Sequence, residues 1–142
     1  AGADEVVVVI GPDRVDVAAE VAAVLPAAGV VVQVERKGTA HAVLAAREAI
    51  AREHDDILVA FADTPLVRPE TFAALRRALG DGAAVAALGF EARDPAGYGR
   101  FVVRDSVLEA IVEHKDASEA QRKITFCNAG LMALDGRHAL AI

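Results

Sequence analysis

Acidic, amide and glycine residues that could bind a ligand recur at the ends of apolar segments of this chain. In FADTPLV, Asp63 follows a strand-like apolar run and precedes a proline. A carboxylate at the rim of a buried strand is costly unless something binds it. It could coordinate a magnesium ion, which usually takes one or two protein carboxylates together with phosphate oxygens. It could equally cap the next turn through the amide of Thr64 or Leu66, and the motif alone leaves both interpretations open.

A second group of candidates lies in VQVERKGTAHA, where Gly38 and Thr39 stand at a predicted turn from strand to helix. Glycine permits the tight turn, Thr39 can cap the helix, and free amides at a helix start favour a polar or anionic group. Gln33 can form paired donor and acceptor hydrogen bonds with an amide-like ring such as uracil. An ordinary capped turn with an exposed glutamine explains the same residues, and local features alone favour it. We expect His41 to have a packing or hydrogen-bonding role.

Three positions in the second half of the chain are also suited to a polar ligand. Gly99 belongs to the glycine turn DPAGYGR, where a ligand can approach the backbone closely. Glu113 ends the strand-like segment VLEAIVE, and we expect it to point into a site. Asn128 interrupts an apolar strand, so its amide needs a partner, either in the core or on a ligand hydroxyl. A surface turn, a solvated charged face and a core hydrogen bond are the corresponding structural explanations.

Length, charge and cysteine content bound the class of protein. The 142 residues suffice for one domain, and a composition of 54% hydrophobic but 4% aromatic residues predicts an aliphatic core. The net charge of -6 argues against general nucleic-acid binding. The single cysteine, Cys127, cannot form an intrachain disulfide, and we expect a small buried residue in a reducing cytosol. No apolar run approaches the roughly 18–20 residues of a membrane span, so we expect a soluble cytoplasmic domain.

Strand-like and helix-like segments alternate up to Phe90. The predicted strands cover residues 5–11, 29–35, 56–62 and 83–90, and the predicted helices cover 13–26, 39–54 and 68–82. Short strand candidates follow at 100–105, 107–113 and 123–134. This order predicts an α/β fold with a mostly parallel sheet, right-handed crossovers and an antiparallel extension. Ligands of such sheets bind beyond the carboxyl ends of the strands, where Asp63 is expected.

The order of the motifs is more specific than any one of them. They are KGTAHAVLAA, FADTPLV, LGFEARDPAGYGR, IVEHKDASEAQRKI and CNAGLM. From about Val31 to Met132 the chain closely resembles the uridyltransferase domain of the bacterial bifunctional GlmU family. The motifs GYGR and IVEHKDAS-x-x-QR are specific to that family. GTAHA and the strand that ends in aspartate are shared with other sugar-nucleotide pyrophosphorylases.

The resemblance implies a Rossmann-like nucleotidyltransferase fold and a function. The family transfers a uridylyl group from UTP to N-acetylglucosamine 1-phosphate, releasing pyrophosphate and UDP-N-acetylglucosamine for peptidoglycan and lipopolysaccharide precursors. The resemblance implies that Gln33, Gly38 and Thr39 hold the uridine. It also implies that Asp63 binds the Mg²⁺ cofactor and acts in catalysis. The residues that it assigns to the N-acetylglucosamine moiety are Gly99, Glu113 and Asn128.

The chain also departs from the family pattern. It has Lys37-Gly38-Thr39 where the family has L-G-T, and Phe61-Ala62-Asp63 where the family has Y-G-D, which we regard as tolerable variation. The phosphate-binding signature L-A-A-G-x-G-T-R-M and the trimer-forming acetyltransferase β-helix are not found. We therefore expect residues 1–142 to be an internal, partial uridyltransferase domain that is inactive alone. The alternatives are a pyrophosphorylase for another sugar nucleotide and a non-catalytic sugar-nucleotide-binding domain.

Overall fold

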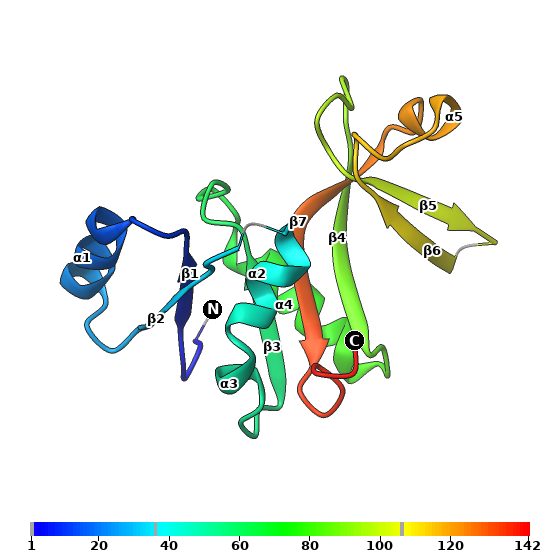
Figure 1. The fold of residues 1–142 in the computed structure, drawn as a ribbon. Coiled ribbons are helices and arrows are strands. Elements are labelled where there is room, and N and C mark those ends of the chain that lie inside the picture. Colours follow the sequence, from blue (N-terminus) through cyan, green and yellow to red (C-terminus); the bar gives the residue numbers. More distant parts are fainter. Residues whose placement is uncertain (1, 36, 106) are drawn as a thin grey trace. The chain divides into compact units, whose positions relative to one another are not determined.

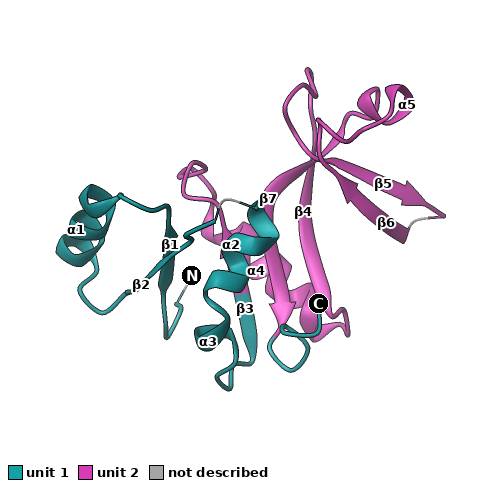
Figure 2. Cartoon of the chain, in the orientation of Figure 1, with its two compact units in different colours: residues 1–57, 136–142 teal, residues 58–135 magenta. Residues whose placement is uncertain are grey.

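A computed structural model describes residues 2–35, 37–105 and 107–142 (Figure 1). The chain divides into two compact units (Figure 2). Unit 1 comprises residues 1–57 and 136–142, and unit 2 comprises residues 58–135. No helix within the described ranges is long and apolar enough to cross a membrane.

Unit 1 is built on a two-stranded parallel sheet. β1 (Val7–Ile10) pairs with β2 (Gly29–Val32) over four residues of each strand. The valine-rich composition of both segments favours extended backbone, because β-branched side chains suit a pleated surface. α1 (Val15–Val24) connects the two strands, as a parallel pair requires. The first predicted strand–helix–strand unit is therefore present, with shorter elements than the sequence indicated.

The helix predicted over residues 39–54 is divided into two. α2 (Thr39–Ala45) is followed by α3 (Arg47–Ile50), and Ala46 between them has φ −91° and ψ +17°. Ala46 and Ile50 are both buried in this arrangement. The alanine-rich sequence has a high helix propensity throughout, but propensity is a weak term that packing can override. Packing therefore decides where the helix ends.

Unit 2 contains a sheet of five strands. Its elements are β3 (Asp56–Ala60), which begins at the end of unit 1, α4 (Pro69–Gly80), β4 (Val85–Glu91), β5 (Arg100–Arg104), β6 (Val107–Val112), α5 (Glu119–Arg122) and β7 (Phe126–Asp135). The strand order is β3-β7-β5-β6, and β4 also pairs with β7. The long strands β4 and β7 lie side by side (Figure 1). β7 is accordingly the most buried strand of the sheet.

The helix α4 covers this sheet with an apolar face. Leu75 of α4 is buried against Leu131 and Ala133 of β7, and these three residues form the centre of the core cluster. Pro69 starts the helix at a position where its missing N–H has no cost. The expected antiparallel extension is present, since β7 runs antiparallel to β4 and β5, and β5 runs antiparallel to β6.

Candidate sugar-nucleotide site

Unit 2 brings together three of the predicted site residues. Gly99 immediately precedes β5, Glu113 immediately follows β6, and Asn128 is the third residue of β7. A Cβ atom placed on Gly99 would lie 3.6 Å from Cβ of Asn128 and 3.7 Å from Oε1 of Glu113. Because β5 pairs with both β6 and β7, residues far apart in sequence meet at one end of three strands. The Glu113 carboxylate and the Asn128 side chain therefore both lie beside the backbone of Gly99.

One of the two polar atoms of the Asn128 carboxamide has a hydrogen-bond partner within the protein. Its Oδ1 accepts a hydrogen bond from the backbone amide of Gly130, with 3.0 Å between the heavy atoms. No partner for its Nδ2 is found within the described ranges. The core hydrogen bond and the ligand contact were alternatives at the sequence level. The structure makes them compatible, because the oxygen is used internally while the two N–H groups remain able to donate to a ligand oxygen.

The glycine turn DPAGYGR is anchored at several points. The amide of Ala96 donates to Oδ1 of Asp94 across 3.0 Å. The ring of Tyr98 packs edge-on against Phe90, with 5.0 Å between ring centroids. Arg100 donates from Nη1 to the carbonyl oxygen of Tyr98. The turn that carries Gly99 is therefore held by packing and hydrogen bonds.

Asp63 lies in the turn that follows β3. The turn is closed by Thr64, whose amide and Oγ1 both donate to the carbonyl oxygen of Phe61, across 3.3 Å and 2.9 Å. The alternative in which the Asp63 carboxylate caps the Thr64 amide is therefore not found, because that amide donates to Phe61. Asp63 is exposed and accepts no hydrogen bond from any residue that the structure describes. Its carboxylate is left for solvent or a ligand.

The donor set at Asp63 restricts the kind of metal that it could hold. Across residues 2–35, 37–105 and 107–142 no group of three or more His, Cys, Asp and Glu side chains is arranged to bind a metal ion. Mg²⁺ needs no such group, because it keeps several waters and takes one or two carboxylates together with substrate phosphates. A single exposed carboxylate fits that coordination. Asp63 therefore fits a magnesium ion that is shared with a phosphate-bearing ligand.

Gly130 connects the Asp63 turn to β7. Its φ is +75°, and a Cβ atom there would lie 2.4 Å from Cδ2 of Phe61. The pairing of β4 with β7 changes register near this residue, as a β-bulge does. Phe61 thus rests on the backbone of the residue whose amide also binds the Asn128 side chain. Gly130 therefore lies against Phe61 and donates its amide to the Asn128 side chain.

The three residues predicted to hold uridine lie in one segment of unit 1. Nε2 of Gln33 lies 3.1 Å from the carbonyl oxygen of Gly38 and 3.1 Å from Nδ1 of His41. Gln33 is half-buried, so it is not the freely exposed glutamine of a plain turn. Gly38 has φ +103°, a conformation that favours glycine, and it occupies the N-cap position predicted for Thr39. His41 has the hydrogen-bonding role expected of it.

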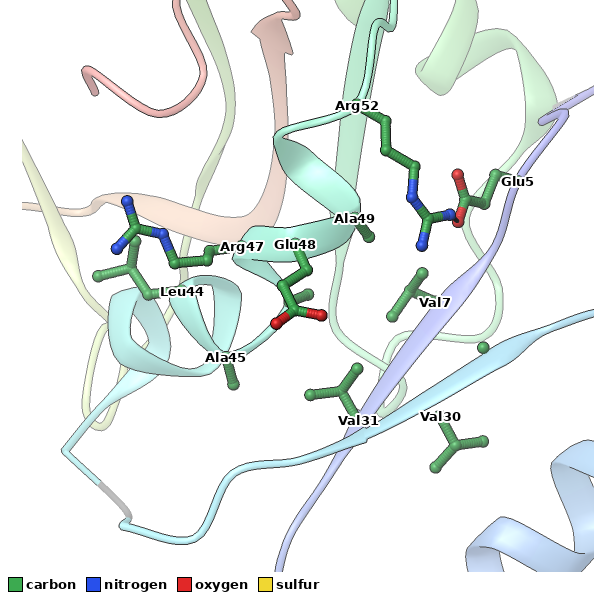
Figure 3. A pocket seen from close by; sticks show the side chains of 12 residues that line it. Glu5, Val7, Val30, Val31, Leu44, Ala45, Arg47, Glu48, Ala49 and Arg52 are labelled. Carbon is green, nitrogen blue, oxygen red and sulfur yellow. Dashed lines mark hydrogen bonds and ion pairs between the residues drawn. The ribbon is translucent and has the colours of Figure 1, made fainter.

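A separate pocket of about 500 Å³ lies in unit 1, between the β1–β2 sheet and the helices α2 and α3 (Figure 3). Valine and alanine side chains form much of its wall, and Glu5 forms an ion pair with Arg52 at one side. Gln33, Gly38 and Thr39 do not line it. The pocket is therefore distinct from the predicted uridine residues.

Several side chains that support the segments around the site were not predicted from the sequence. Arg100 is only 1% exposed and reaches Nδ1 of His114 with Nη2, across 3.1 Å. Ser118 and Gln121 form a capping box at α5, with both reciprocal hydrogen bonds present. The S-x-x-Q spacing is a recognised signal for such a cap and could have been found. No local pattern distinguishes a buried arginine from an exposed one.

Comparisons with known proteins show the family of this chain. Residues 1–129 match the MobA-like NTP transferase domain. The chain is 63% identical over all 142 residues to the bifunctional protein GlmU of Xanthobacter autotrophicus, and 64% identical over 135 residues to that of Bradyrhizobium diazoefficiens. These matches cover 100% and 95% of the chain but 32% and 30% of the relatives, so the chain spans about a third of their length. The resemblance to GlmU is confirmed, and it extends beyond the range from Val31 to Met132.

Solved structures match the fold. A glucose-1-phosphate thymidylyltransferase from Bacillus anthracis superposes with a TM-score of 0.68 at 16% identity, over 92% of this chain and 52% of that one. A UDP-glucose pyrophosphorylase in complex with UDP-glucose gives 0.60 at 16% identity, over 94% and 59%. The predicted nucleotidyltransferase fold, as an incomplete Rossmann-like unit, is thereby confirmed. The chain belongs to the family of MobA-like NTP transferase domains.

Proposed function

We propose that this chain supplies part of a uridyltransferase that converts UTP and N-acetylglucosamine 1-phosphate into UDP-N-acetylglucosamine and pyrophosphate. The observation that carries the proposal is the meeting of Gly99, Glu113 and Asn128 at one end of three strands. It is supported by 63% identity to a bifunctional GlmU protein over the whole chain. Residues 1–142 would form a partial uridyltransferase domain.

The sugar half of the ligand would lie against Gly99. The absence of a side chain there lets a ligand approach the backbone. The carboxylate of Glu113 can accept hydrogen bonds from sugar hydroxyls, and Nδ2 of Asn128 can donate to a sugar or acetyl oxygen. Polar groups that converge from different strands fix the orientation of a bound molecule. This combination suits an amide-bearing sugar.

The uridine half would be held by Gln33, Gly38 and Thr39. Nε2 of Gln33 is engaged by Gly38 and His41, which orients the carboxamide and leaves its oxygen to accept from the N–H of the uracil ring. The glycine at position 38 lets the ring approach the backbone beside Thr39. A preorientated carboxamide loses less entropy on binding than a mobile one.

Asp63 would bind Mg²⁺ and so contribute to catalysis. When bound, the ion offsets the negative charge that develops on the phosphate oxygens. The chain's own residues would bind the sugar phosphate and the nucleotide, and catalysis would rest on positioning and electrostatics.

The wider role follows from the relatives, which are bifunctional proteins about three times as long as this chain. We place the enzyme in the cytoplasm, in the synthesis of peptidoglycan and lipopolysaccharide precursors. The acetyltransferase β-helix and the homotrimer contacts would belong to the rest of such an enzyme. We expect residues 1–142 alone to bind ligand but not to catalyse transfer efficiently.

The first experiment is calorimetric titration of the chain with UDP-N-acetylglucosamine, with and without Mg²⁺. We expect magnesium-dependent binding that weakens at least about tenfold in Asp63→Ala, because an ionic ligand is lost. Asn128→Asp should also weaken binding, since it keeps the acceptor for Gly130 but removes both donors. Asp81→Ala is the matched control, an exposed aspartate at the C-terminal end of α4.

The outcomes separate the alternatives. Equal affinity for UDP-glucose and UDP-N-acetylglucosamine would favour a pyrophosphorylase for another sugar nucleotide. Binding that is indifferent to Mg²⁺ and to Asp63→Ala would overturn the metal role and favour a non-catalytic binding domain. Absence of binding would show that these residues do not form the half-site.

A further inference from the structure

The side chain of Arg100 is buried without an acidic partner. It is 1% exposed, and none of the described carboxylates forms an ion pair with it. Its Nε is buried and has no hydrogen-bond partner within the described ranges. A buried charge without an opposite charge is a costly way to stabilise a fold, because apolar residues of similar volume do so as well or better. The position of Arg100 therefore calls for a role beyond packing.

The guanidinium of Arg100 links the segments that carry the sugar-site residues. Nη1 donates to the carbonyl oxygen of Tyr98, directly before Gly99. Nη2 lies 3.1 Å from Nδ1 of His114, directly after Glu113, and 3.5 Å from the carbonyl oxygen at the end of α5. One side chain thus connects the glycine turn with the charged segment that follows β6. A substitution of Arg100 would therefore affect the positions of both Gly99 and Glu113.

In the contact between Arg100 and His114, the guanidinium determines which group donates the hydrogen bond and which accepts it. A guanidinium has only donors and stays protonated. In a hydrogen bond with this guanidinium, Nδ1 of His114 must therefore be the acceptor. Any replacement at position 114 that lacks an acceptor at the Nδ1 position would break the contact. An asparagine would keep it, because its Oδ1 lies near the place of Nδ1.

The strand register places Arg100 beneath the site. Arg100 lies opposite the residues that immediately precede Glu113 in the β6 segment and Asn128 in β7. Successive side chains of a strand point to opposite faces of the sheet. The face that Gly99 opens toward Glu113 and Asn128 is therefore not the face that holds the Arg100 side chain. Arg100 supports these residues from behind and would not touch a ligand.

We infer that Arg100 and His114 are positioning residues that hold Gly99 and Glu113 for the N-acetylated sugar, and so set the affinity for the sugar half of the ligand. The inference rests on the proposed function, because it concerns the same site. Arg100 and His114 act through the Tyr98 carbonyl and the segment after Glu113. The contribution of the sugar to binding is measured by the ratio of the Kd for UDP to the Kd for UDP-N-acetylglucosamine.

That ratio is the quantity to measure, by calorimetric titration of the chain in Mg²⁺. We expect it to fall about tenfold in His114→Leu and in Arg100→Met, since each loses a hydrogen bond to a charged group. It should keep its wild-type value in His114→Asn. Arg104→Met is the matched control, because Arg104 ends the same strand but is exposed and paired with Glu109. A merely structural role would weaken the binding of both ligands alike and leave the ratio unchanged.

Amide hydrogen exchange of the ligand-free chain provides a second test of the positioning role. The amide of Tyr98 donates to Pro95, and the amide of Asp116 donates to Glu113, so these two turns report on the support. Both should exchange faster in His114→Leu but not in His114→Asn, while amides of the β4–β7 pair stay unchanged. If Arg100→Met does not fold, the comparison of His114→Leu with His114→Asn decides whether the positioning role holds.

The two proposals fail differently. A wild-type chain that binds UDP and UDP-N-acetylglucosamine equally would overturn the proposed sugar site. Unchanged exchange in the two turns of His114→Leu would overturn the support itself. If the wild-type chain binds the sugar nucleotide more tightly than UDP and the ratio is the same in His114→Leu, the positioning role is overturned and the proposed function stands.

Discussion

The backbone amide of Asn128 donates a hydrogen bond to the carbonyl oxygen of Gly99, with 2.9 Å between nitrogen and oxygen. This bond joins β7 to the glycine turn and brings Gly99 beside two polar side chains. The volume that a side chain at Gly99 would occupy is bordered by Ile111 at 3.4 Å, Asn128 at 3.6 Å and Glu113 at 3.7 Å. Because residue 99 is glycine, no side chain occupies this volume.

We therefore predict that Gly99→Ala weakens ligand binding but hardly changes the stability of the fold. The new methyl group would stand between Glu113 and Asn128 and should weaken UDP-N-acetylglucosamine binding at least about tenfold. Its nearest contact, at 3.4 Å, is at the edge of ordinary van der Waals range, so the free energy of unfolding should change by less than about 1 kcal/mol. Calorimetric titration and urea unfolding measure the two effects.

The neighbouring Gly97→Ala is the matched control with the opposite expectation. Gly97 has φ +84° and open space around its Cα, so alanine there meets backbone strain but no clash. It should lower the free energy of unfolding by about 1 kcal/mol and leave binding nearly unchanged. The prediction is wrong if Gly97→Ala abolishes binding while Gly99→Ala does not.

A second prediction concerns Gly130, which combines φ +75° with a close approach to Phe61. Gly130→Ala adds backbone strain and an overlap at 2.4 Å, and should lower the free energy of unfolding by roughly 2–4 kcal/mol. Urea unfolding followed by circular dichroism measures the loss.

The double variant Phe61→Ala/Gly130→Ala tests the cause. Removing the ring relieves the overlap but not the strained φ, so the double variant should be more stable than the sum of the single losses predicts, by about 1 kcal/mol. Strict additivity would show that the ring and Gly130 do not interact.

A third prediction concerns the contact between Gln33 and His41. His41→Leu removes one of the two groups that hold the Gln33 carboxamide, so UDP should bind about three- to tenfold more weakly. His41→Asn should retain most of the affinity, because its Oδ1 can accept from Gln33. His138→Leu, at an exposed histidine, is the control. Equal UDP affinity in His41→Leu and the wild type would remove Gln33 from the proposed uridine site.

A fourth prediction follows from Cys127, which is fully buried. Burial raises the pKa of the Cys127 thiol, while the nearby charge of Arg100 acts in the opposite direction. In the unfolded chain a thiol ionises near its ordinary pKa of about 8.5. Since the folded pKa is the higher one, the contribution to stability is fully present below about pH 8.5 and is lost as the pH rises through the folded pKa.

Urea unfolding at pH 7, 9 and 10 in reducing buffer tests this sign, with the pH values set by the ordinary thiol pKa of about 8.5. The free energy of unfolding of the wild type should fall relative to that of Cys127→Ala as the pH rises, by at most about 1.4 kcal/mol per pH unit. A difference that stays constant over this range would contradict the raised pKa.

Much of the local structure could be predicted because it depends on short-range properties. Runs of β-branched residues mark β1 and β2, and Pro69 marks the start of α4. The division of the helix after Ala45 could not be predicted, because the alanine-rich segment favours helix throughout and burial of Ile50 decides the break. The motif around Asp63 left a cap on the Thr64 amide open, and only the structure shows that this amide donates to the carbonyl oxygen of Phe61.

The sequence by itself placed Gly99 in a glycine turn, Glu113 at the end of a predicted strand and Asn128 inside another, and so indicated that each could meet a ligand. Only the tertiary structure decided that they meet one another, and that Arg100 lies buried behind them. The reason is physical. Strand propensity depends on each residue and its neighbours, whereas the register of β5 against β6 and β7 depends on side chains far apart in the chain that pack in a common sheet.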